Sequence, residues 1–267
     1  MKLKTLSQMN SVRLFKVMFV TIVLCMSCKN KENNKKEVAQ QIVLEKLENS
    51  PAYLDAVLQL KEHDSTSYMG QDTINFNFEV KNYTLGAQTE SPNATQLANS
   101  KKGQHIHFIL NNQPYSAHYT ASFKKDIPKG VNHLVAFLSR SYHESVKNEK
   151  SVVVKKLITG GSAADTTGLE IDAPTLIYSR PKGTYAGKDT EQILLDFFVL
   201  NTTISENGNK VIVSINDQEF TVTQWAPYLI KGLPIGTTTI ELKLTDATGA
   251  LIPGPFNEVK RTITLTE

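Results

Sequence analysis

The sequence predicts an all-β protein that contains two tandem antiparallel β-sandwiches. Three observations support this prediction. Short segments alternate apolar and polar residues, which is the period of a half-buried strand. Gly, Pro and Asn residues separate these segments at regular intervals, as turns do. The same series of segments occurs twice, in residues 56–159 and 174–267. Sandwiches of such strands are typical of the immunoglobulin-like architecture.

The duplication rests on four matched blocks that occur in the same order in both copies. They are Tyr68–Thr73 with Tyr185–Thr190, Phe78–Asn82 with Phe197–Asn201, Gly103–Gln113 with Gly208–Gln218, and Ile127–Gly130 with Leu233–Gly236. The copies differ mainly in one loop, because the connection across residues 82–103 is 14 residues longer than its counterpart, residues 201–208. Residues 160–173 form the linker between the copies.

Residues 1–27 have the features of an export signal. Four basic residues and no acidic residue precede or flank the apolar run Val17–Met26, as in secretory signals. That run is shorter than the roughly 20 residues that a membrane-spanning helix needs. Ser27 and Cys28 match the small-then-cysteine pattern of a bacterial lipoprotein cleavage site. We therefore predict lipidation at Cys28 and a lipid-anchored protein of the cell envelope, held at the outer membrane on its periplasmic face or at the surface.

Residues 28–55 are predicted to form a polar tether with a short helix. Lys29–Lys36 is a run of charged and amide side chains, which has nothing to bury and is expected to be disordered. Glu37–Glu48 places Val38 and Ile42 at helical spacing. This spacing predicts a short helix that ends before the following proline.

The charge balance argues against nucleic acid as a partner. The formal charge is +3, but four of the 29 basic residues lie in the signal segment. The remaining 25 basic and 26 acidic residues give a nearly neutral chain, which lacks the basic excess that nucleic-acid binding requires. No cysteine follows Cys28, so the repeats contain no disulfide, thiol nucleophile or cysteine metal ligand.

The histidines distinguish the two copies. All six lie in the first: His63, His105, His107, His118, His133 and His143. Alternate residues of a strand point to opposite faces, so His105 and His107 share the outer face of their strand, opposite its apolar row. Lys210 and Ile212 stand at the matching positions of the second copy. The imidazoles are therefore an addition to a shared scaffold.

These histidines suggest a metal site on the outer face of the first sandwich. His133 is the third candidate, since the repeat aligns it with the outward Thr239. Three neutral imidazoles suit Cu²⁺ or Zn²⁺. The alternative is that His105, His107 and His133 are ordinary surface histidines packed under the long loop, residues 83–102.

A second candidate site is the loop that follows the strand ending near Leu138. Its polar and charged residues are Arg140, Ser141, Tyr142, His143, Glu144 and Lys147. A guanidinium group is a forked donor suited to a carboxylate or a phosphate, so the loop is a candidate for binding a small anion or an acidic peptide. The alternative is a structural loop in which Arg140 pairs with Glu144.

Five runs of the chain are distinctive. They are Tyr83–Thr89, Ala98–Ser100, Gly103–His107, Phe137–Ser145 and Tyr178–Tyr185. Together they resemble a group of Bacteroidetes envelope lipoproteins, and the resemblance covers nearly all of the chain after the tether. Members of that group commonly carry the name phosphopeptide-binding protein. The resemblance thus implies tandem immunoglobulin-like domains and a phosphorylated peptide as ligand.

The sequence therefore favours a non-enzymatic binding protein. It has no glycine-rich phosphate loop, nucleophile elbow or zincin helix, so a hydrolase is the least supported class. The leading hypothesis is a module that binds a peptide, a protein or a small anion through the first repeat, without a cofactor. The second hypothesis is a Cu or Zn protein that uses His105, His107 and His133.

Overall fold

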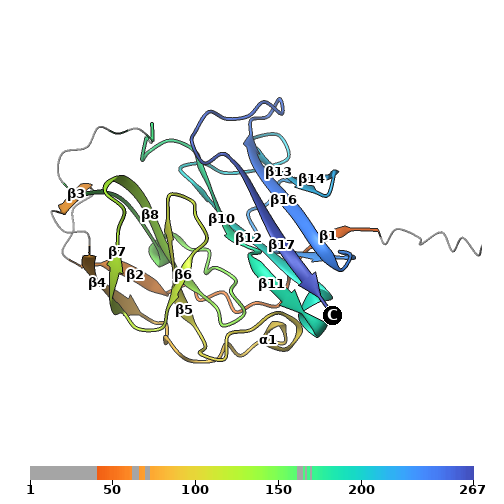
Figure 1. The fold of residues 1–267 in the computed structure, drawn as a ribbon, viewed down its shortest axis with the longest axis horizontal. Coiled ribbons are helices and arrows are strands. Elements are labelled where there is room, and N and C mark those ends of the chain that lie inside the picture. The colour runs from red at the N-terminus through yellow and green to blue at the C-terminus, as the bar shows by residue number, and fades with distance from the viewer. Residues whose placement is uncertain (1–40, 62–65, 70–72, 161–164, 166, 169) are drawn as a thin grey trace, which may run out of the picture. The chain divides into compact units, whose positions relative to one another are not determined.

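β-Strands form the fold in the computed structural model, as the sequence predicts (Figure 1). The structure describes residues 41–61, 66–69, 73–160, 165, 167, 168 and 170–267. All the elements below belong to one compact unit, Ala39–Glu267. The predicted signal peptide, Cys28 and His63 lie outside the described residues. No helix among the described residues is long and apolar enough to cross a membrane.

The first repeat is a sandwich of two sheets. The smaller sheet has the strand order β2-β4-β7, and the larger has the order β3-β9-β8-β5-β6. The strands are β2 (Val57–Leu60), β3 (Thr66–Met69), β4 (Thr73–Lys81), β5 (His105–Leu110), β6 (Ser116–His118), β7 (Ser122–Asp126), β8 (Gly130–Ser139) and β9 (Val152–Thr159). The long loop between β4 and β5 contains the one-turn helix α1 (Asn93–Gln96), and the 3₁₀ turn η1 (Glu149–Ser151) precedes β9.

The second repeat has the same topology. Its larger sheet has the order β11-β17-β16-β13-β14, and its smaller sheet contains β10, β12 and β15. In both repeats the first strand of the larger sheet pairs in parallel with the last strand of the repeat. The elements are β10 (Thr175–Arg180), β11 (Gly183–Ala186), the 3₁₀ turn η2 (Gly187–Thr190), β12 (Gln192–Leu200), β13 (Lys210–Ile215), β14 (Gln218–Val222), β15 (Tyr228–Lys231), β16 (Gly236–Thr245) and β17 (Glu258–Thr266). The matching strand orders agree with the predicted duplication.

Each sandwich encloses an apolar core between its two sheets. In the first repeat, Phe76 of β4 and Phe108 of β5 meet edge-to-face with ring centroids 4.9 Å apart, and both rings are buried. In the second repeat, Phe197 of β12 and Val213 of β13 belong to the corresponding cluster. The predicted inward rows of both copies therefore face their own cores.

Strand β1 (Val43–Lys46) corrects the predicted short helix of the tether. It pairs antiparallel with β15 and adds a fourth strand to the smaller sheet of the second repeat. Ile42 is buried in the core of that repeat, and Leu44 packs against it. A sheet edge with unpaired backbone groups and an open apolar core outweighs the weak local preference of a short segment.

The outer face of the larger sheet of the first repeat packs against β10 and β12 of the second. Phe137 of β8 and Phe198 of β12 lie with ring centroids 4.5 Å apart. The side-chain amide of Asn112 donates to the carbonyl oxygen of Leu176, and its oxygen accepts from the backbone N–H of Tyr178. Strand β5 is consequently buried on both faces. The face that the sequence pattern predicts to be at the surface is an interface between repeats.

Candidate functional site

His105 and His107 lie on the interface side of β5. Their neighbours Ile106 and Phe108 point into the core of the first repeat, so strand alternation turns both imidazoles toward the second repeat. Both side chains are fully buried, with 0% exposure. Sequence alternation thus placed them correctly on one face, and the second repeat covers that face.

His143 reaches the same place from the loop that follows β8. Strands β5 and β8 are antiparallel with His105 opposite Ser139, so the chain that leaves β8 emerges beside His105. A tight turn then closes, in which the backbone N–H of His143 donates to the carbonyl oxygen of Arg140. His143 has a φ of +71°, a left-handed conformation that is uncommon for residues other than glycine.

The second repeat contains the same turn with a glycine at this position. Gly249 has a φ of +88° and donates its N–H to the carbonyl oxygen of Asp246. The bridge from Ser139 to Ser145 in the first repeat likewise matches the bridge from Thr245 to Leu251. Since glycine adopts this conformation freely, the imidazole of His143 is added at a backbone cost.

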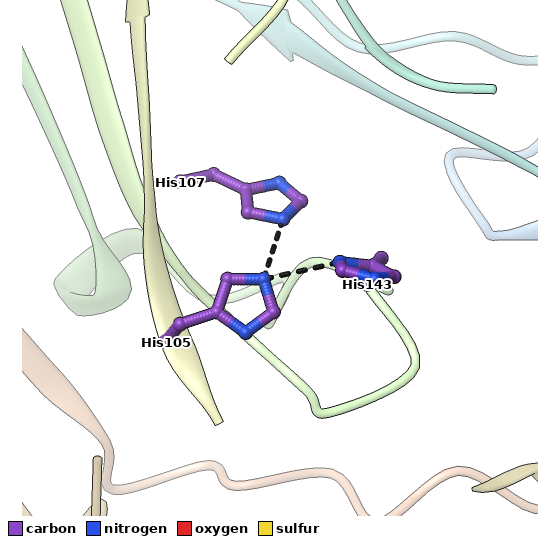
Figure 2. A group of neighbouring side chains, drawn as sticks. All are labelled: His105, His107 and His143. Atoms are coloured by element: carbon purple, nitrogen blue, oxygen red, sulfur yellow. Dashed lines mark hydrogen bonds between the residues drawn. The ribbon is translucent and has the colours of Figure 1, made fainter. Parts of the chain in front are cut away.

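The three imidazoles meet through their ring nitrogens (Figure 2). Nε2 of His105 lies 2.9 Å from Nε2 of His107 and 3.1 Å from Nδ1 of His143. The three candidate ligand atoms all lie within 4.8 Å of one another. Nδ1 of His105 donates to the carbonyl oxygen of Gly103 at 2.8 Å, and Nδ1 of His107 lies 3.2 Å from Oγ of Ser179. A carbonyl oxygen only accepts, so Nε2 of His105 carries a free lone pair directed at the cluster.

Tyr115 completes the group. Its ring stacks on His107 with centroids 3.5 Å apart and an interplanar angle of 12°. Its hydroxyl oxygen lies 3.1 Å from Nδ1 of His143. Tyr119 lies on another side of the cluster, with its ring centroid 5.0 Å from that of His105. Aromatic rings therefore hold the imidazoles in fixed orientations.

The environment keeps the imidazoles neutral. Burial lowers the pKa of His105 to about 4 and lowers the pKa of His107 and of His143 well below the usual range. The positive charges of Arg180 and Lys182 lower the pKa of each ring further. A neutral imidazole is the form that coordinates a metal ion.

His133 does not join this cluster, which corrects the predicted third ligand. The backbone N–H of His133 bonds to the side chain of Asn111 at the far end of β5, several residues beyond His105 and His107. Its ring stacks on Phe256 with centroids 5.6 Å apart. Because β5 and β8 are antiparallel, His133 near the start of β8 lies away from His105 and His107. The other end of β8, at Ser139, lies beside them.

The predicted anion-binding loop is buried and internally bonded. Arg140 forms an ion pair of 2.9 Å with Glu144 and donates to the carbonyl oxygens of Pro51 and Ser145. The remaining predicted residues are also engaged: Ser141 bonds to Thr89, Tyr142 donates to Ser50, and Lys147 pairs with Asp196 at 2.5 Å. Arg140 is 3% exposed. This arrangement matches the structural alternative, and it disfavours an incoming anion or peptide at this loop.

The described strands define an all-β protein with immunoglobulin-like or fibronectin-like sandwiches. No family model matches the chain, and no curated protein matches it. Among solved structures, it is similar to fibronectin(III)-like modules of CbhA from Clostridium thermocellum, with 12% identity over 79% of this chain and 94% of that chain and a TM-score of 0.28.

Two further solved structures are similar to the chain at the same low level. The central fibronectin-III array of RIM-binding protein has 11% identity over 82% of this chain and 72% of that chain, with a TM-score of 0.26. SGBP-B of the Bacteroides ovatus mixed-linkage glucan utilization locus, solved with a heptasaccharide, has 11% identity over 79% of this chain and 47% of that chain, with a TM-score of 0.23. Likeness at this level gives no information about a ligand.

Proposed function

We propose that this protein binds a transition-metal ion, Cu or Zn, through His105, His107 and His143. The observation that carries the proposal is the convergence of three ring nitrogens within 4.8 Å of one another where the repeats meet, with His105 and His107 buried and His143 half-buried. Imidazole nitrogens are common ligands of both metals. The proposal retains the metal and two of the ligands predicted from the sequence and replaces His133 by His143.

Three features of the surroundings support ion binding. The hydrogen bond from His105 to Gly103 fixes the tautomer that presents Nε2, which is the usual role of the groups behind a metal ligand. Burial lowers the pKa of each ring, so that no proton competes at neutral pH. His143 adopts a left-handed backbone conformation, which is unfavourable for a histidine. Its counterpart Gly249 adopts the same conformation without that cost. Costs of this kind gather at functional sites.

We further propose that the protein acts as a lipid-anchored binding protein of the cell envelope. The proposal rests on the signal-like segment and on Cys28. The full burial of His105 and His107 suits the holding of a small ion better than the turnover of a large substrate.

Metal analysis of the full chain tests the proposal. The chain is freed of metal with a chelator, incubated with Cu²⁺ or Zn²⁺, desalted and analysed for metal content. The wild type is expected to retain one ion per chain. His143→Asn is expected to retain none, because asparagine tolerates the left-handed backbone but removes one of three ligands.

His133→Phe is the matched control, since it removes another buried imidazole of the same repeat. It is expected to retain one ion per chain and to melt at a higher temperature with the metal than without it. An ion that binds only the folded chain stabilises by about 2.7 kcal/mol at 100 times its dissociation constant. Equal metal retention by wild type and His143→Asn would refute the site, as would loss of metal from His133→Phe alone.

A further inference from the structure

The interface beside the histidines contains two cations without a carboxylate partner. Arg180 is 7% exposed. Its guanidinium donates to the hydroxyl of Tyr185, and its Nε has no hydrogen-bond partner among the described residues. Lys182 donates to the carbonyl oxygen of Tyr115, and its Nζ lies 3.7 Å from the centre of that ring. None of the ion pairs formed between described residues includes Arg180 or Lys182.

The buried acids nearby are already committed. Asp196 lies opposite Arg180 in the β10–β12 register, but its carboxylate accepts from Lys147 and from the hydroxyl of Ser145. Glu144 pairs with Arg140. A divalent ion held by three neutral imidazoles would add two further positive charges to this region. Buried charge of one sign is costly unless an opposite charge compensates it.

Tyr115 can offer the compensating charge once an ion is bound, although burial raises the pKa of its phenol in the metal-free chain. Its hydroxyl oxygen is a fourth donor atom beside the three ring nitrogens, since it lies 3.1 Å from Nδ1 of His143. The side chain is 4% exposed. The same ring contacts the ammonium group of Lys182 and lies 5.5 Å from the guanidinium carbon of Arg180. A negative charge on this oxygen would therefore form between an ion and two cations.

The four donor atoms form a continuous row. From His107 through His105 and His143 to Tyr115, the successive separations are 2.9, 3.1 and 3.1 Å. Two donors at 2.0–2.1 Å from one ion are at most about 4.2 Å apart, so the histidine nitrogens, which span up to 4.8 Å, would draw together on binding. Nitrogen and oxygen donors generally bind Cu²⁺ more tightly than Zn²⁺.

We infer that Tyr115 is the fourth ligand, as a phenolate, of a three-nitrogen, one-oxygen site that favours Cu²⁺. On binding, the O–H bond of Tyr115 breaks, its proton leaves to solvent, and an O–Cu bond forms. The inference rests on the proposed metal site and adds to it the ligand that offsets the charges of Arg180 and Lys182.

Visible absorption of the copper-loaded full chain tests the inference. One equivalent of Cu²⁺ is expected to produce a phenolate-to-copper charge-transfer band in the wild type, with phenolate modes in the resonance Raman spectrum. Tyr115→Phe keeps the ring that stacks on His107 and loses only the oxygen. It is expected to lose the band, to retain copper, and to bind it at least about tenfold more weakly.

Tyr119→Phe is the matched control, because Tyr119 also lies against the cluster but directs its hydroxyl to Oγ of Ser100 at 2.7 Å. It is expected to keep the band. A wild-type chain that holds copper without the band, or a band that persists in Tyr115→Phe, would overturn this inference and leave the three-histidine site standing. Failure of the wild type to retain any copper or zinc would overturn both.

Discussion

At the scale of single residues, His143 shows what the sequence could have revealed. The turn Arg140–Glu144 aligns without a gap with Asp246–Ala250, which places His143 on Gly249. A histidine in place of a turn glycine is the signal of an added function, because only glycine takes the left-handed conformation without cost. The matched blocks end at Gly130, before this turn, so the residues of the loop taken alone indicate an anion site. Tyr115 had no such signal, since its role depends on a contact with another loop.

His133 provides a prediction about pH. Burial lowers its pKa to about 4, and neither ring nitrogen has a hydrogen-bond partner among the described residues. Its cross-strand neighbour Lys156 is ion-paired with Asp165. Above pH 6.5 the ring is neutral in both folded and unfolded chains. Between pH 6.5 and 4 the unfolded chain takes up the proton first, so the free energy of unfolding falls as the pH falls.

The variant His133→Phe isolates this contribution. Over that pH range the wild type is expected to lose up to roughly 3 kcal/mol more stability than the variant. Urea unfolding of both metal-free chains at pH 7 and pH 4 gives the comparison. Parallel losses in the two chains would contradict the assignment.

At the scale of secondary-structure elements, the strands that face their own core were predictable and β1 was not. The recurrence of apolar residues at every second position, Ile106, Phe108 and Leu110, is local information, and the structure confirms the inward row. The segment around Ile42 and Leu44 has too few apolar residues to reveal its period. It becomes a strand because it pairs with β15, a strand that is distant in the sequence. Tertiary pairing of this kind overrides local preference.

The contribution of β1 is testable by a matched pair of substitutions. Ile42 is 5% exposed and belongs to the core of the second repeat, whereas the next residue, Val43, is 41% exposed. Ile42→Ala is expected to lower the free energy of unfolding by about 2 kcal/mol or more, and Val43→Ala by less than about 0.5 kcal/mol. Urea denaturation measures both. Similar values for the two variants would show that β1 is not part of the folded core.

At the scale of the whole molecule, the contact between the repeats creates the site. His105 and His107 come from one repeat, and Ser179, Arg180 and Lys182 come from the other. The sequence identified two of the three histidines because they share one strand face. It could not place them in an interface, because the covering strands β10 and β12 begin 70 and 87 residues after the start of β5. No local sequence feature indicates which outer face is covered.

This arrangement predicts that metal affinity depends on the second repeat. Ser179→Ala removes the hydroxyl that lies 3.2 Å from Nδ1 of His107 and is expected to weaken Cu²⁺ binding by about 10- to 100-fold. Ser116→Ala is the control, because it removes a hydroxyl that contacts His118 instead. Competition against a chelator of known affinity measures both variants. Unchanged affinity in Ser179→Ala would separate the site from the second repeat.

The burial of His105 and His107 also governs how quickly an ion can enter or leave. An ion cannot reach two nitrogens with no exposed surface unless the interface between the repeats opens first. Local opening of this kind has a rate that does not depend on the concentration of the ion. The rate of uptake should therefore rise with ion concentration only until opening becomes limiting, and then stay constant. Once captured, the ion should exchange slowly with solution ions, so that such a protein would retain its metal through brief changes in supply.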